Sequence, residues 1–160
     1  MEPRIETFTE KKLIGQRIIT SLTEHKTFEL WQGFMQRRKE IENSIGTDLY
    51  SVQTFNDQYW ANFNPANKFE KWAAIEVKDH NSIPDNMEAF TIQSGLYAVF
   101  IHKGLPSEGP KTFQYIFGTW LPNSTYQLDD RPHFAVMGDK YSNTDPASEE
   151  ELWIPVMLKK

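Results

Sequence analysis

The sequence predicts an α+β domain in which a largely antiparallel sheet carries two helices on one face. Two observations lead to this fold. Short apolar strand patterns alternate with two helix patterns, and the order strand, helix, strand, strand occurs twice, each time with a further strand ahead of it. The tripeptide Lys-Thr-Phe stands at both expected helix starts, at 26–28 and 111–113, and strands 13–19 and 96–102 are 83 residues apart.

These matches at a nearly constant offset indicate an internal duplication. A third match supports it, because 72–77 and 151–156 correspond at an offset of 79 when their valines are aligned, or 81 when their tryptophans are aligned. We therefore expect one domain over residues 1–160, with repeats at about 1–79 and 86–160 and a ligand groove between them.

The first repeat begins with a loosely alternating segment and then a strand at 13–19 that is rich in β-branched residues. A helix follows, with Thr27 as a capping residue and Gly46 as the stop signal. Strands are expected at 49–55 and 69–78. The helix has apolar residues at helical spacing, which are Phe28, Trp31, Phe34, Met35 and Ile41.

The second repeat follows the same plan. Pro110 suits the first turn of its helix, which is expected to run over 111–121 and to end before Pro122. The apolar stripe of this helix consists of Phe113, Ile116, Phe117 and Trp120. The strands are expected at 90–92, 96–102, 133–137 and 150–158.

Composition excludes several classes of protein. With 39% hydrophobic and 14% aromatic residues, the chain is not disordered, and a net charge of −5 disfavours direct binding of nucleic acid. The absence of cysteine excludes disulfides and thiol catalysis, and no apolar run approaches the roughly 20 residues of a membrane span. The four histidines form no metal motif, so we expect no metal and no cofactor, and a cytoplasmic location without a secretory signal.

The last strand suggests a site. Its alternation places Glu151 and Trp153 on the face away from the helices, and Trp72 lies on the same face in the first repeat. An indole exposed on an open sheet face needs an explanation, and a carboxylate beside aromatic rings would bind flat, lipophilic cations. The alternative is that residues 149–151 are a solvated acidic lead into an edge strand. The residues expected to face the helices are Leu152, Ile154 and Val156.

Four segments carry a family resemblance: Gly95–Phe100, Tyr115–Pro122, Pro132–Phe134 and Glu151–Val156. The chain resembles the GyrI-like effector-binding domains of the SOUL/GyrI superfamily, which include the ligand-binding halves of AraC-type and MerR-type multidrug regulators. The resemblance implies two repeats related by pseudo-twofold symmetry.

The resemblance also implies the composition of the ligand site. The central acid of the family corresponds to Glu151 and the pocket aromatic to Trp153, with Trp72 across the groove. Tyr50 and Trp120 fall at positions that complete the walls, although Trp120 suits the core under its helix better than a ligand wall.

The leading expectation is a stand-alone small-molecule binding protein that takes amphipathic aromatic, cationic compounds around Glu151. Regulators of the resembled family carry a helix-turn-helix domain, and no such segment occurs in this sequence. We therefore expect signalling through a separate regulator or a homodimer.

The alternative to a binding protein is a hydrolase of strained cyclopropane rings, with Glu151 as general acid or base and no other catalytic residue assigned. The third is a protein inhibitor such as a gyrase modulator.

Overall fold

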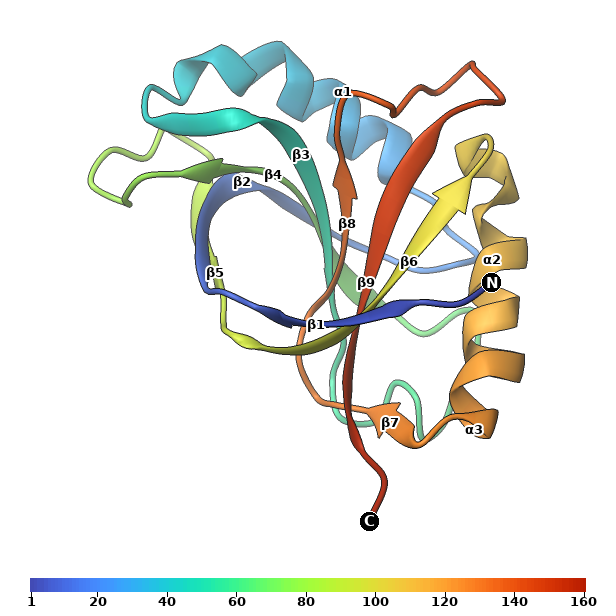
Figure 1. The fold of residues 1–160 in the computed structure, drawn as a ribbon. Coiled ribbons are helices and arrows are strands. Elements are labelled where there is room, and N and C mark those ends of the chain that lie inside the picture. The colour runs from blue at the N-terminus through green and yellow to red at the C-terminus, as the bar shows by residue number, and fades with distance from the viewer.

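The computed structural model describes all 160 residues as nine strands and two main helical segments (Figure 1). In the first half the elements are β1 (Arg4–Phe8), β2 (Lys11–Thr20), α1 (Thr27–Arg37), β3 (Ser44–Thr54) and β4 (Phe69–Val77). In the second half they are β5 (Glu88–Ile92), β6 (Gly95–Lys103), α2 (Gly109–Tyr115), α3 (Leu121–Asn123), β7 (Tyr126–Leu128), β8 (His133–Met137) and β9 (Glu149–Leu158).

The sheet has the order β1-β6-β9-β8-β3-β4-β2-β5, and every pair of neighbours is antiparallel. Exchanging β1 with β5, β2 with β6, β3 with β8 and β4 with β9 gives the same order in reverse. A pseudo-twofold axis therefore passes between β3 and β8, where Ser51 lies opposite Ala135. This arrangement confirms the predicted fold. The short strand β7 pairs only with β9.

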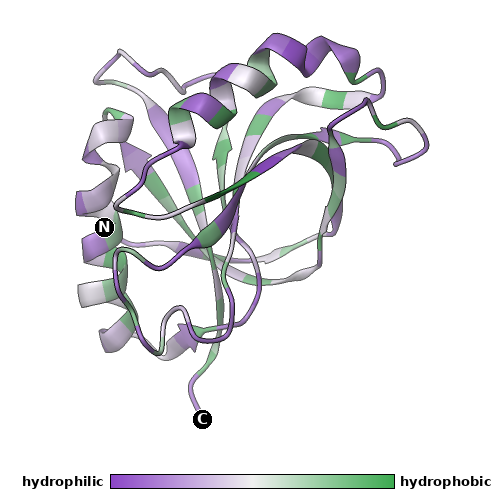
Figure 2. Cartoon of the chain, turned by 180° about the vertical axis from the view of Figure 1, so that it is seen from behind, coloured by the Kyte–Doolittle hydropathy of each residue, from purple (hydrophilic) through white to green (hydrophobic).

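The two helices cover one face of the sheet and form two separate cores with it. Leu30 and Phe34 of α1 are buried against β2 and β4, and Ile116 is buried against β6, β8 and β9. In Figure 2 both helices carry alternating hydrophobic and hydrophilic residues, as amphipathic surface helices do. Leu152, Ile154 and Val156 lie in the second of these cores, as the alternation of the last strand predicts.

The opposite face, which we call the inner face, is curled upon itself (Figure 1). Buried side chains fill this curl. Gly15 permits the curl, because an added Cβ would overlap the backbone of Ala73 and Ala74 on β4. Trp72 and Trp153 are 4% and 7% exposed, so the expectation of indoles on an open sheet face is wrong. The buried inner-face residues are Phe8, Leu13, Tyr50, Val52, Trp72, Ala74, Ile92, Tyr97, Val99, Phe134 and Trp153.

The helix boundaries differ from those expected. The first helix ends at Arg37 and one 3₁₀ turn, before Gly46, and Phe28 is 76% exposed and lies outside the buried stripe. The second helical segment continues through a widened turn at Ile116–Trp120 into α3 and includes Pro122. Proline is tolerated there because the widened turn directly before it already interrupts the regular i to i−4 hydrogen bonds of the helix. No helix of the structure combines the length and apolar character that a membrane span requires.

Candidate functional site

Glu151 lies on β9 between Ile101 of β6 and Val136 of β8. Its side chain is 35% exposed and points to the inner face. One carboxylate oxygen, Oε1, accepts a hydrogen bond from the indole nitrogen of Trp153 at 3.1 Å. The other oxygen, Oε2, accepts one from the guanidinium of Arg4 at 2.9 Å. The carboxylate is thus fixed between an aromatic donor and a cation.

A cleft of about 360 Å³ opens beside Glu151. Its nine lining residues are Asp48, Ile101, Val136, Gly138, Asp139, Lys140, Glu149, Glu150 and Glu151. Five of them carry carboxylates and one carries an ammonium group, and the Lys140 Nζ lies 3.9 Å from the Glu149 carboxylate. Because like charges in a concave site reinforce one another, the cleft attracts cations.

Aromatic rings surround Trp153, the hydrogen-bond donor to Glu151. The ring of Trp153 is stacked on Phe134 with centroids 5.3 Å apart, and Phe8 and Tyr97 meet it edge-on. The cleft itself is lined by carboxylates and two aliphatic side chains, and no indole lines it. Trp153 therefore contributes to the site through its hydrogen bond to Glu151.

Tyr50 lies on β3 opposite Val136, next to the strand pair that carries Glu151. Burial raises the pKa of Tyr50, and the negative charges of Glu76, Asp48 and Glu151 raise it further. The phenol therefore stays protonated at neutral pH. The structure brings Tyr50, Trp72, Trp153 and Glu151 to one face of the sheet.

The first repeat contains a second carboxylate–indole pair. Trp72 donates its indole N–H to the Glu70 carboxylate at 2.6 Å, and Arg17 donates to the other Glu70 oxygen at 2.9 Å. Glu70 and Trp72 precede Glu151 and Trp153 by 81 residues each. Glu70 is not among the site residues expected from the sequence, although the shared Glu-x-Trp spacing was a signal for it.

Trp120 lies on the other face of the sheet. Its ring meets Phe100 edge-on at 5.1 Å and is stacked on Tyr126 at 6.2 Å. These contacts belong to the helix-side core. The structure therefore does not bring Trp120 together with the other four expected site residues, and a contact between Trp120 and a ligand stays a prediction.

Two ionisable groups of the helix side lie close to the cleft. Burial raises the pKa of Glu150, which lines the cleft, while His102 and Lys71 partly offset this rise. Burial also lowers the pKa of Lys71, whose ammonium donates to the Thr27 hydroxyl at 3.1 Å. Glu150 is a half-buried acid, whereas the sequence placed it in a solvated charge run.

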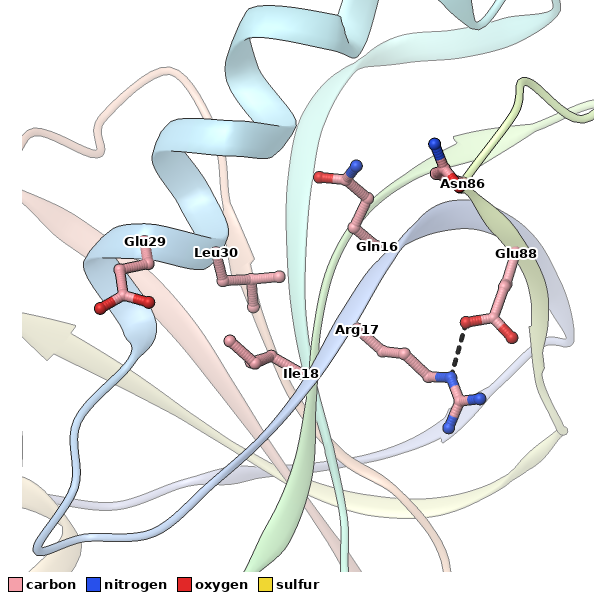
Figure 3. Close-up of a pocket in the computed structure, with 7 residues that line it drawn as sticks. All are labelled: Gln16, Arg17, Ile18, Glu29, Leu30, Asn86 and Glu88. Carbon is pink, nitrogen blue, oxygen red and sulfur yellow. Dashed lines mark hydrogen bonds and ion pairs between the residues drawn. The ribbon is translucent and has the colours of Figure 1, made fainter.

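A second pocket of about 350 Å³ lies between α1, β2 and the start of β5 (Figure 3). It is lined by Gln16, Arg17, Ile18, Glu29, Leu30, Asn86 and Glu88. Its one cation, Arg17, is already paired with Glu88 at 2.6 Å and with Glu70. None of the expected site residues lines this pocket, so the Glu151 cleft is the stronger candidate.

A pseudo-symmetric curled sheet with an aromatic inner-face core and a cleft rich in carboxylates is the architecture of an α+β ligand-binding domain. Residues 1–157 match the GyrI-like small molecule binding domain, and the chain belongs to this family. The family resemblance seen in the sequence is thereby confirmed. A comparison with curated proteins gives no match.

Solved structures share the fold at low sequence identity. SAV2435 bound to tetraphenylphosphonium has a TM-score of 0.77 and 16% identity, over 98% of this chain and 94% of that one. The C-terminal domain of EcmrR has a TM-score of 0.72 and 15% identity, over 99% and 98% of the two chains. A hydrolase from Listeria innocua has a TM-score of 0.61 and 11% identity, over 98% and 92%.

Proposed function

We propose that this small-molecule binding domain captures lipophilic aromatic cations at the cleft beside Glu151, in effector sensing or sequestration linked to transcription regulation. The observation that supports this most directly is the position of Glu151. Its carboxylate borders an acidic cleft and accepts a hydrogen bond from the indole of Trp153.

The chemistry of the cleft favours this ligand class. A delocalised cation loses little hydration on binding, and in this cleft it gains from several carboxylates and from the aliphatic side chains of Ile101 and Val136. SAV2435, which shares the fold, is bound to tetraphenylphosphonium, a compound of this class. EcmrR, another protein with this fold, forms a complex with DNA.

The proposal is tested by titrating tetraphenylphosphonium into the protein and following heat release and tryptophan fluorescence. Glu151→Gln keeps the size of the side chain and removes its charge. We expect a loss of about tenfold in affinity, which corresponds to about 1.4 kcal/mol. Glu70→Gln is the matched control, because it removes the charge of the equivalent carboxylate–indole pair in the first repeat. Equal affinities in wild type and Glu151→Gln would refute the role of Glu151.

A role in regulation would require a partner, because a net charge of −5 disfavours direct contact with DNA. We propose that the partner is a separate regulator protein or a second copy of this chain. Size-exclusion chromatography with and without tetraphenylphosphonium tests the second copy. A monomer under both conditions would exclude the homodimer.

Hydrolysis of a strained electrophile is the second candidate function. It is favoured by the hydrolase from Listeria innocua, which shares the fold, and by the raised pKa of Glu150 next to Glu151. Of the two carboxyls, one would donate a proton and the other would activate water. Incubation of a cyclopropane-containing alkylating compound with wild type, Glu151→Ala and Glu150→Gln tests this. Decay at the same rate as in buffer would exclude hydrolysis.

A further inference from the structure

The first strand of the chain brings a cation to the candidate site. On β1, Arg4, Glu6 and Phe8 share one side of the strand, and Phe8 is buried in the inner-face core. Arg4 lies opposite Val99 of β6, which in turn lies opposite Trp153 of β9. Arg4 therefore extends over the inner face at the level of Trp153, although 147 residues separate it from Glu151.

The guanidinium of Arg4 contacts both the Glu151 carboxylate and the Trp153 ring. It donates to Glu151 at 2.9 Å and to Glu6 at 2.6 Å, and its central carbon lies 5.7 Å from the centre of the Trp153 ring. The hydrogen bond to Glu6 and then the interactions with Glu151 raise the pKa of Arg4, so it stays charged. One carboxylate oxygen of Glu151 and one face of the indole are thus already used by the protein.

The contact is weak enough to exchange. The side chains of Arg4 and Glu151 are 46% and 35% exposed, and ion pairs at such positions contribute little because water and salt screen them. β1 is also an edge strand, paired only with β6. Moving the Arg4 side chain away requires no change in the sheet, and it frees both the Glu151 oxygen and the ring face of Trp153.

The first repeat provides an internal comparison. There Arg17 neutralises Glu70 beside Trp72, with Nη1 to Oε2 at 2.9 Å. The Arg17 side chain is 44% exposed, close to the value of Arg4, but β2 is paired on both sides, with β4 and β5. Only in the second repeat does the neutralising arginine come from an edge strand and bind a carboxylate that lines the acidic cleft.

We propose that Arg4 is a tethered cation that competes with cationic ligands for Glu151 and so sets the charge preference of the site. This inference rests on the proposed function. A cation must displace Arg4 to reach the carboxylate and the indole, whereas an anion of the same shape gains from Arg4. Arg4 is therefore a specificity-determining residue whose removal shifts the site further towards cations.

Tetraphenylphosphonium and tetraphenylborate test this, because they have the same four-phenyl shape and opposite charges. In Arg4→Met, which keeps the length of the side chain, we expect tetraphenylphosphonium to bind about two- to fivefold more tightly, and tetraphenylborate to bind more weakly by a similar factor. Arg4→Lys should restore the wild-type ratio of the two affinities. Arg17→Met is the matched control and should leave that ratio unchanged.

The outcomes separate the two proposals. Opposite shifts for the two ions support the role of Arg4, because a general loosening of the structure would move both affinities in the same direction. If tetraphenylphosphonium binds, but the ratio of the two affinities is the same in Arg4→Met as in wild type, this inference is overturned and the proposed function stands. Absence of tetraphenylphosphonium binding in wild type and Arg4→Met overturns the proposed function, and this inference with it.

Discussion

The pH dependence of stability should carry the signature of one buried histidine. His133 of β8 is 5% exposed and lies among aromatic rings, stacked on Trp60 at 5.7 Å and edge-on to Phe55 at 5.0 Å. Burial, with a smaller effect from the charge of Arg131, lowers the pKa of His133 to about 3. The ring is therefore neutral in the folded protein throughout the mildly acidic range.

The sign and size of the effect follow from linkage. An unfolded histidine has a pKa of about 6.5, so between this value and the folded value the unfolded chain binds one more proton than the folded chain. The contribution of His133 to stability is therefore complete above pH 6.5 and is lost as pH falls towards 3. Between pH 7.5 and pH 5 the free energy of unfolding falls by about 2 kcal/mol. This loss depends little on the pKa of His133 in the folded protein, because that pKa lies well below pH 5.

Urea unfolding followed by tryptophan fluorescence at several pH values measures this loss. His133→Phe keeps an aromatic ring in the cluster and removes the titrating group. The difference in unfolding free energy between wild type and His133→Phe should change by about 2 kcal/mol from pH 7.5 to pH 5. His25→Ala, at an exposed position, is the control and should follow the wild-type curve. Parallel curves for wild type and His133→Phe would refute the reasoning.

Three substitutions test the packing by urea unfolding. Gly15→Ala should cost about 1–3 kcal/mol, because the added Cβ would overlap the carbonyl oxygen of Ala73. Phe34→Ala should cost about 3–5 kcal/mol, because the ring is fully buried between α1 and the sheet. Trp72→Phe should cost about 1.5–3 kcal/mol, because the Glu70 carboxylate loses its indole donor. If a variant unfolds at the same urea concentration as wild type, the packing described for that residue is contradicted.

The strands and the repeat order were predictable because they depend on local patterns. Leu152, Ile154 and Val156 alternate strictly with polar or bulky neighbours, and the structure buries all three on the helix side. Helix ends were less predictable. Gly46 is a good stop signal in isolation, yet Ile41 already takes an extended backbone conformation after the 3₁₀ turn, and β3 begins at Ser44.

The site was predictable only in part. Glu151 and Trp153 share a face because strand geometry fixes their parity, and the structure adds the hydrogen bond between them. The contact of Arg4 with Glu151 has no local signal, since it depends on which strand pairs with β6. The burial of both indoles depends on the curl of the whole sheet, which no single segment determines.

The pairing of the edge strands has a consequence for folding. β1 of the first half adds to β6 of the second, and β5 of the second half adds to β2 of the first. A chain cleaved between residues 79 and 86 would therefore give two fragments, each lacking a neighbour for its leading strand. Such fragments should complement one another when mixed, and neither should complete its sheet alone. Cooperative assembly of the two halves is thus built into the strand connections.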